Sequence, residues 1–434
     1  MPTLFQLVRE MAVRKRVIVV GGGASGMMAA GRAAECGADV LLLEKTPRLG
    51  NKLCITGKGR CNVTNVAELS EFVAHFGETG RFLYGALSHF FVPDLRAFLE
   101  RRGMPTKVER GGRVFPASED AREVAAALEG YLVLNGVRVL RRHPVEQILV
   151  EGQQVVGVKA CDRAFGGCAV VLATGGASYP RTGSTGDGYR LAAELGHRIL
   201  PIRPALVPLV VGEPWVHNLQ GLGLRNVQVT LLVENRPIAQ QFGEMLFTHF
   251  GLSGPVVLTL SKQALDAQSK GRVSLSVNLK PALSPDEVDQ RLQRELDQHG
   301  RQRMQHILAS LLPKSMVQVV LDLAGIAADK PANQVNAAER KRVAGLLQDL
   351  RLTIVGSRPI DEAIVTAGGV DTREIDPRTM ESRLVKGLFF CGEVIDVDAD
   401  TGGYNLQAAF STGHLAGESA AAAAVGARQD LESR

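Results

Sequence analysis

The sequence has few aromatic residues, few cysteines and no long apolar run. Aromatic side chains make up 5% of the 434 residues, with one tryptophan, Trp215. Together with 47 glycines, this scarcity favours an α/β protein with many tight loops over a carbohydrate-binding β-sandwich. Because no run of about 18 apolar residues is present, we expect no transmembrane helix and no membrane partner.

The cysteine pattern excludes two common classes of metal and redox protein. None of the six cysteines belongs to a C-x-x-C pair, as in a zinc ribbon or a thioredoxin-type motif, and we predict no metal site. In the first 16 residues the basic cluster follows the apolar stretch, the reverse of a secretory signal peptide. We therefore expect a cytoplasmic protein. Met11 is an alternative start, which would make residues 1–10 an extension.

The net charge of +5 is small, but the basic residues are clustered. The clusters lie at residues 101–113, 138–142, 301–303 and 340–342. Such clusters can contact phosphates, although solvated helix and loop faces are the commoner explanation. The composition therefore permits an anionic partner without requiring one.

A glycine-rich motif follows the first apolar segment. Residues 16–20, RVIVV, predict a buried strand, and GGGASG then places Gly21, Gly23 and Gly26 in the pattern G-x-G-x-x-G. This motif lets a backbone approach a pyrophosphate and lets the N-terminus of the next helix bind it. A glycine-rich turn that binds nothing is the alternative.

The segment after this motif supports the dinucleotide interpretation. An Ala-rich helix is predicted over about 27–35, and the strand that follows over 38–44 ends in Glu44. An acid at this position accepts hydrogen bonds from ribose hydroxyls in dinucleotide sites. The motif alone does not distinguish FAD from NAD.

Two later segments favour FAD. Residues 167–176 predict a strand that runs into Thr174 and Gly175, and a strand over 388–391 leads to Gly392 and Glu393. A glycine-rich loop and a helix follow the second strand. In two-dinucleotide flavoproteins these parts contact the ribityl chain and the flavin edge that gains negative charge on reduction. A cofactor contacted by both ends of the chain suits the long FAD molecule better than NAD.

The sequence resembles the BaiN-like bacterial flavoproteins, which are NAD(P)/FAD-dependent oxidoreductases. The resemblance covers nearly the whole chain after about Arg14, and its most specific segments are GKGRCNVTN and TGGYNLQAAFSTG. Familiar members have Ser where this chain has Thr56. The resemblance implies an α/β fold: a glutathione reductase-like, two-dinucleotide-type Rossmann domain for FAD, with an inserted β-barrel-like domain and a helical module.

The resemblance also implies a domain plan. The FAD domain is expected to be split between residues 14–202 and 357–434. A β-barrel-like substrate domain is expected at 203–284 and 346–356, where apolar and polar residues alternate. A helical insertion is expected at 285–345, beginning at Ser284-Pro285-Asp286.

The predicted cofactor-binding residues come from the motifs above and from the resemblance. They are Gly21, Gly23, Ala24, Ser25, Gly26, Glu44, Lys45, Lys52, Gly59, Arg60, Cys61, Thr174, Gly175, Gly392, Glu393, Gly402, Gly403, Tyr404, Asn405 and Leu406.

Three residues are candidates for a catalytic role. Cys61 is a candidate proton donor beside a hydride transfer, and the alternative is a cysteine packed under the flavin. Arg60 is a candidate in the same loop, although binding pyrophosphate or pairing with an acid is the favoured role. His249 is a third candidate proton donor, and a structural histidine is the alternative.

The resemblance implies reduction of a C=C bond conjugated to a carbonyl group, with NAD(P)H as a transient reductant. Family members act on uridine in ribosomal RNA or on enones of the bile-acid type. The clustered basic residues favour ribosomal RNA or its precursor as the partner, and a small-molecule enone is the alternative. An amine oxidase, another oxidase and a non-catalytic flavin-binding RNA or assembly factor also stay open.

Overall fold

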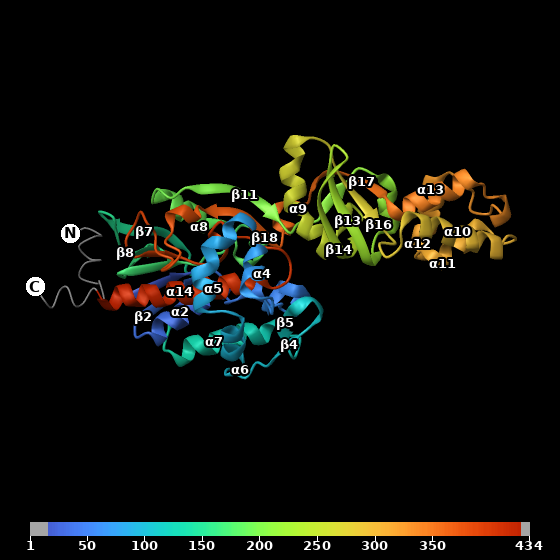
Figure 1. Cartoon of the computed structure of the whole chain (residues 1–434). Helices are drawn as coiled ribbons and strands as arrows, with labels where there is room; N and C mark the ends of the chain where they lie inside the picture. Colours follow the sequence, from blue (N-terminus) through green and yellow to red (C-terminus); the bar gives the residue numbers. More distant parts are fainter. Residues whose placement is uncertain (1–15, 427–434) are drawn as a thin grey trace, which may run out of the picture. The chain divides into compact units, whose positions relative to one another are not determined.

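The computed structural model describes residues 16–426, so Met11 lies outside the described residues. The chain divides into two compact units, each with its own hydrophobic core (Figure 1). Unit 1 comprises Met1–Pro204 and Ile364–Arg434, and unit 2 comprises Ala205–Ala363. The chain thus leaves unit 1 once and returns to it.

Unit 1 is built on a five-stranded sheet in which every pair of neighbours is parallel. The strands, in sheet order, are β19 (Leu388–Phe390), β10 (Ala169–Leu172), β1 (Arg16–Val20), β2 (Asp39–Glu44) and β6 (Arg138–Arg141). All residues of β10 and β19 are buried, as are four of the five in β1. Their apolar runs therefore reflect helix packing on both faces of a parallel sheet.

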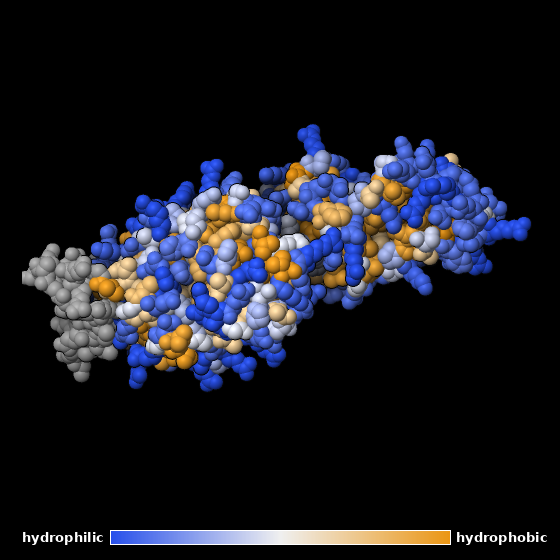
Figure 2. All heavy atoms as spheres, turned by 60° about the horizontal axis from the view of Figure 1, so that its bottom comes forward, coloured by the Kyte–Doolittle hydropathy of each residue, from blue (hydrophilic) through white to orange (hydrophobic). Residues whose placement is uncertain are grey.

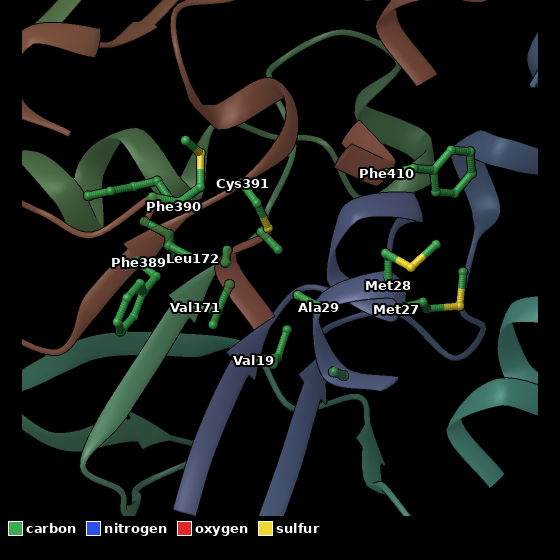
Figure 3. Close-up of a cluster of buried hydrophobic side chains, with 14 of the residues drawn as sticks. Val19, Met27, Met28, Ala29, Val171, Leu172, Phe389, Phe390, Cys391 and Phe410 are labelled. Atoms are coloured by element: carbon green, nitrogen blue, oxygen red, sulfur yellow. The ribbon is translucent and has the colours of Figure 1, made fainter. Parts of the chain in front are cut away.

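Two helices from opposite ends of the chain pack together beside this sheet. They are α2 (Ala24–Glu35) and α14 (Tyr404–Gly426). Figure 3 shows Met27 and Met28 of α2 in one cluster with Phe390 and Phe410. All four residues are fully buried. Helix α2 begins three residues before the predicted Met27, because Gly23 already occupies the N-cap position.

Small residues set the distance between these two helices. A Cβ atom built on Gly413 would lie 2.4 Å from the carbonyl oxygen of Ser25, and one on Gly417 would lie 2.3 Å from that of Ala29. Real Cβ contacts are not this short, so glycine lets the two backbones touch.

Shorter elements surround the parallel sheet of unit 1. The three-stranded antiparallel sheets are β3-β5-β4 (Thr64–Asn65, Arg113–Pro116, Thr106–Val108) and β7-β8-β9 (Val145–Glu151, Gln154–Ala160, Arg163–Gly166). A two-stranded sheet joins β11 (Ile199–Ala205) to β18 (Val365–Val370). The remaining helices are α3 (Asn51–Ile55), α4 (Leu69–Ala74), α5 (Tyr84–His89), α6 (Val92–Glu100), α7 (Ala121–Leu134) and α8 (Asp187–Glu194).

Unit 2 combines a closed barrel with a group of helices. The barrel order is β12 (Leu209–Val211), β15 (Gly251–Ser253), β14 (Arg236–Phe247), β13 (Gly223–Val233), β16 (Val273–Asn278) and β17 (Leu350–Ser357), and α9 is Pro255–Ala267. Between β16 and β17 lie α10 (Pro285–Gln298), α11 (Met304–Leu311), α12 (Lys314–Ala324) and α13 (Ala337–Gln348). One core joins barrel and helices, so they form a single compact unit.

The start of α10 follows local sequence rules. The Ser284 hydroxyl accepts a hydrogen bond from the Glu287 N–H at 3.3 Å, and Glu287 Oε2 accepts one from the Ser284 N–H at 2.7 Å. This reciprocal capping explains why the helix starts at Pro285. Hydrophilic residues cover most of the visible surface of α10–α13 in Figure 2. Within residues 16–426, no helix is both long and apolar enough to cross a membrane.

We expect Gly413→Ala to lower the stability of the protein because the added methyl group collides with the backbone of α2. Overpacking of this kind costs about 1–3 kcal/mol. Gly130→Ala in α7 is the matched control, since nothing lies within 4 Å of a Cβ built there. Thermal unfolding should show a lower Tm for Gly413→Ala and an unchanged or higher Tm for Gly130→Ala. Equal Tm values for the two variants would contradict the close helix contact.

Candidate functional site

The glycine motif forms a tight turn between β1 and α2. Gly21 has a φ of +103°, and a Cβ on it would lie 2.5 Å from the carbonyl oxygen of Ala173. A Cβ on Gly26 would lie 1.9 Å from the carbonyl oxygen of Gly21. By contrast, nothing lies within 4 Å of a Cβ on Gly23, where α2 begins without a side-chain cap. The space beside Gly23 and the N–H groups of Ala24 and the following residues suit a pyrophosphate.

Glu44 connects the end of β2 to this turn. Its Oε2 accepts a hydrogen bond from the Gly22 N–H at 2.7 Å, and its Oε1 accepts one from the Thr46 N–H at 2.7 Å. The carboxylate is therefore fixed in place and retains further lone pairs for ribose hydroxyls. The adjacent Lys45 donates to Asp187 at 2.5 Å, which links β2 to the start of α8.

Glu393, after β19, is held by groups from three other segments. Its Oε2 accepts from Lys52 Nζ at 2.7 Å, while Oε1 accepts from the Thr366 N–H at 2.7 Å and from the Ser178 hydroxyl at 3.2 Å. Lys52 also donates to Ser178 at 2.7 Å. No motif marked Ser178 or Thr366, because their importance depends on where the segments meet.

The loop that opens α14 is tied to β3. A Cβ on Gly403, where φ is +100°, would lie 2.3 Å from the carbonyl oxygen of Thr64, and Asn65 Nδ2 donates to the Gly402 carbonyl at 3.1 Å. The Asn405 side chain accepts from the Ala399 N–H and donates to its carbonyl, both at 2.9 Å. Asn405 therefore shapes the loop with its side chain.

Tyr404, the first residue of α14, is engaged in ring contacts. Its ring stacks on His75 with centroids 3.9 Å apart and lies edge-on to Phe72 at 4.8 Å. Burial raises the pKa of its hydroxyl to about 12. With the Tyr404 and Asn405 side chains occupied, the backbone N–H groups of Tyr404 to Leu406 are the groups that α14 offers to a ligand.

His75 is a candidate that the sequence motifs missed. Its Nδ1 lies 2.9 Å from Asp400 Oδ2, and both side chains are partly exposed. A carboxylate that accepts from one ring nitrogen leaves the other nitrogen able to hold or release a proton. The pair lies beside Tyr404 at the start of α14, and tertiary structure alone brings it together.

Arg60 is paired with acids rather than free. Its guanidinium donates to Glu109, lies 3.1 Å from a carboxylate oxygen of Glu119 and stacks 4.2 Å above the ring of Phe115. Hydrogen bonding to Glu109 raises the pKa of Arg60, so the side chain stays charged. Acid pairing is one of the two roles that the sequence favoured, the other being pyrophosphate binding. Gly59, just before it, has a φ of +84° and open space around its Cβ position.

Cys61 lies in the core of unit 1. The residue is 0% exposed and has a left-handed φ of 57°. Burial raises the pKa of its thiol to about 12, so it is neutral near pH 7. These properties favour the packing alternative for Cys61.

His249 belongs to unit 2, whereas all the other predicted site residues belong to unit 1. It is exposed and lies edge-on to Phe250 at 4.9 Å. The Arg358 guanidinium lies 4.7 Å from the Phe250 ring and pairs with Glu362 at 2.6 Å. His249 thus lies in a small surface cluster of unit 2.

Three buried polar atoms in unit 1 bear on whether FAD fits. Thr174 Oγ1, Thr64 Oγ1 and Asn62 Oδ1 have no hydrogen-bond partner within the described part of the chain. An unsatisfied buried polar group costs about 1–3 kcal/mol, which a ligand with hydroxyl and ring polar groups can recover. They lie in the T-G-G segment, in β3 and in the GKGRCN loop, so the residues present fit FAD.

A family described as "HI0933-like protein Rossmann domain" matches residues 15–419. The chain belongs to this family. It is also 34% identical over 409 residues to the 3-dehydro-bile acid delta(4,6)-reductase of Clostridium scindens, covering 94% of this chain and 99% of the relative. It is 32% identical over 396 residues to the ribosomal RNA dihydrouridine synthase of Escherichia coli, covering 91% and 95%. The predicted family is confirmed.

Solved structures show the same fold. An open flavocytochrome c3 fumarate reductase aligns with a TM-score of 0.52 and 18% identity over 97% of this chain and 81% of that one. A 3-ketosteroid delta1-dehydrogenase from Sterolibacterium denitrificans aligns with a TM-score of 0.50 and 15% identity over 94% and 100%. The Rossmann-type α/β fold is confirmed, and the relatives' names support the prediction of an oxidoreductase enzyme.

We expect Cys61 to resist alkylation in the folded protein at pH 8. A pKa of about 12 leaves only about one thiol in ten thousand as the reactive thiolate. Cys36 and Cys161 are exposed and serve as internal controls. Peptide mass spectrometry after iodoacetamide treatment should find label on the controls and, only after unfolding, on Cys61. Labelling of native Cys61 at the rate of Cys161 would contradict its burial.

Proposed function

We propose that this protein is an FAD-dependent oxidoreductase that uses NAD(P)H to reduce a C=C bond conjugated to a carbonyl group. The observation that carries the proposal is the meeting of α2 and α14, from the N-terminal and C-terminal parts of the chain, with two helix N-termini and unsatisfied buried polar atoms. Two relatives also bear the names of a bile-acid reductase and a dihydrouridine synthase, whose substrates contain such a bond.

In this proposal the residues of unit 1 divide the binding of FAD among them. The N-terminus of α2 binds the pyrophosphate, and Glu44 accepts from a ribose. Glu393, oriented by Lys52, accepts from a ribityl hydroxyl. The N–H groups at the N-terminus of α14 would stabilise negative charge on the flavin. When bound, FAD would supply the hydride, with NAD(P)H as its transient reductant.

The proton for the second carbon requires a donor that substrate can reach. Cys61 is fully buried even without a ligand, whereas the His75 side chain is 29% exposed. Asp400 orients the His75 ring through the 2.9 Å contact to Nδ1. We therefore favour His75 over Cys61 as the proton donor.

Ribosomal RNA is the proposed substrate, on the basis of the basic clusters in the sequence. Arg101, Arg110 and Arg138 have no acidic partner in the described structure. Other members of these clusters are paired: Lys107 with Glu119, and Arg141 with Glu129 at 2.9 Å. The pairing of these cations with acids favours the second candidate, a small-molecule enone of the bile-acid type.

The six free cysteines suit a reducing compartment such as the cytoplasm.

Dihydrouridine in ribosomal RNA tests the substrate. Nucleoside mass spectrometry should show its loss in a strain that lacks the gene, and plasmid-borne wild-type protein should restore it. Gly26→Ala should not restore it, because the added Cβ disrupts the pyrophosphate turn, whereas Gly130→Ala should. Unchanged dihydrouridine in the deletion strain, with NADPH-dependent enone reduction by the purified yellow protein, would favour the small-molecule candidate. A colourless protein that cannot be reconstituted with FAD would refute both.

The proton donor is tested by comparing His75→Asn with Cys61→Ala. Both variants should retain FAD and be reduced by NAD(P)H at the wild-type rate. Reoxidation by the C=C substrate should slow by about 10²–10⁴-fold in His75→Asn only, the usual contribution of general acid catalysis. If Cys61→Ala slows this step and His75→Asn does not, the assignment is reversed.

A further inference from the structure

Two histidines and a glutamate gather on the surface of unit 1, away from the glycine motif. His89 is the last residue of α5, while His414 and Glu418 lie four residues apart on one face of α14. One ligand atom from each of the three lies within 4.8 Å of the other two. His89 and Glu418 are 329 residues apart in the chain, so no local sequence pattern links them.

One carboxylate oxygen of Glu418 is available as a metal ligand. Its Oε2 accepts from Arg32 Nε at 3.0 Å and from Nη2 at 2.5 Å, and lies 3.3 Å from His89 Nε2. No described residue forms a hydrogen bond with Oε1. Arg32 also pairs with Glu35 at 2.9 Å, so its charge stays compensated if Glu418 turns toward a second cation.

The His414 ring is held in place and has an unsatisfied ring nitrogen. Its ring stacks on Phe90 with centroids 4.5 Å apart and an interplanar angle of 11°, which fixes the ring plane. Its Nδ1 is buried and has no hydrogen-bond partner among the described residues. A metal ion bound at this nitrogen would take the place of the missing hydrogen-bond partner.

We propose that His89, His414 and Glu418 bind a divalent transition-metal ion of the zinc type, with water as the fourth ligand. Two imidazoles and a carboxylate are a common donor set for zinc. Bonds of about 2.0–2.1 Å in a tetrahedral site place the ligand atoms about 3.3 Å apart, so the cluster must contract. His89 allows this, because it is exposed at the end of α5. The bound ion would join α5 to α14 and stabilise that contact.

Zinc titration of the full-length protein tests the site. The protein should carry Cys36→Ser, because this exposed thiol could bind zinc itself. After chelator treatment, isothermal titration with ZnCl2 should show one tight site per chain. His89→Ala and His414→Ala should each weaken it at least tenfold, and zinc should raise the Tm of the parent protein but not of these two variants. His306→Ala is the matched control, since this histidine is exposed on α11 of unit 2.

If His414→Ala disturbs the packing against Phe90, the His89→Ala variant still tests the site, because His89 is exposed and its loss leaves that packing intact. Circular dichroism and Tm without zinc verify that each variant is folded. Equal zinc affinity in His89→Ala, His306→Ala and the parent would overturn the proposal. So would the absence of a tight site in the parent protein, or tight binding that requires Cys36.

Discussion

The close approach of α2 to α14 and to the ends of β10 and β19 is the constraint on which unit 1 depends. At Gly413 and Gly417 a Cβ atom would lie within 2.4 Å of a backbone oxygen of α2, and at Gly392 within 2.4 Å of the Ser25 hydroxyl oxygen. Segments from both ends of the chain can meet here only because side chains are missing. The same contact brings the Gly392–Glu393 segment to α2, so the N-terminal and C-terminal parts of unit 1 contribute to one site.

Around this contact, buried and partly buried polar groups are held by partners from distant segments. Glu44 is fixed by two backbone N–H groups, while Glu393 is fixed by Lys52, Ser178 and the Thr366 N–H. Fixed carboxylates and the uncapped N-terminus of α2 form a polar environment that need not reorganise when a charged cofactor binds. The atoms left unsatisfied, such as Thr174 Oγ1, mark where such a ligand would complete the structure.

Periodicity and glycine spacing predicted the central strands and the two glycine-rich turns, because these depend on residues close in sequence. Strand β1 follows RVIVV, and α10 starts where Ser284 and Glu287 can cap each other. The roles of individual polar side chains were harder to predict. The acids that engage Arg60 come from a segment 49 or more residues away, and Cys61 is in the core although its loop is rich in charged and polar residues.

By itself, the sequence determined the family, the parallel Rossmann-type sheet and the turns at which only glycine fits, because backbone sterics and apolar periodicity are local properties. Only the tertiary structure decided which polar groups meet. It paired His75 with Asp400, surrounded Glu393 with Ser178 and Thr366, and brought His89 to Glu418 on α14. The physical reason is that hydrogen bonds and metal coordination act over about 2–3 Å in space, whatever the separation along the chain.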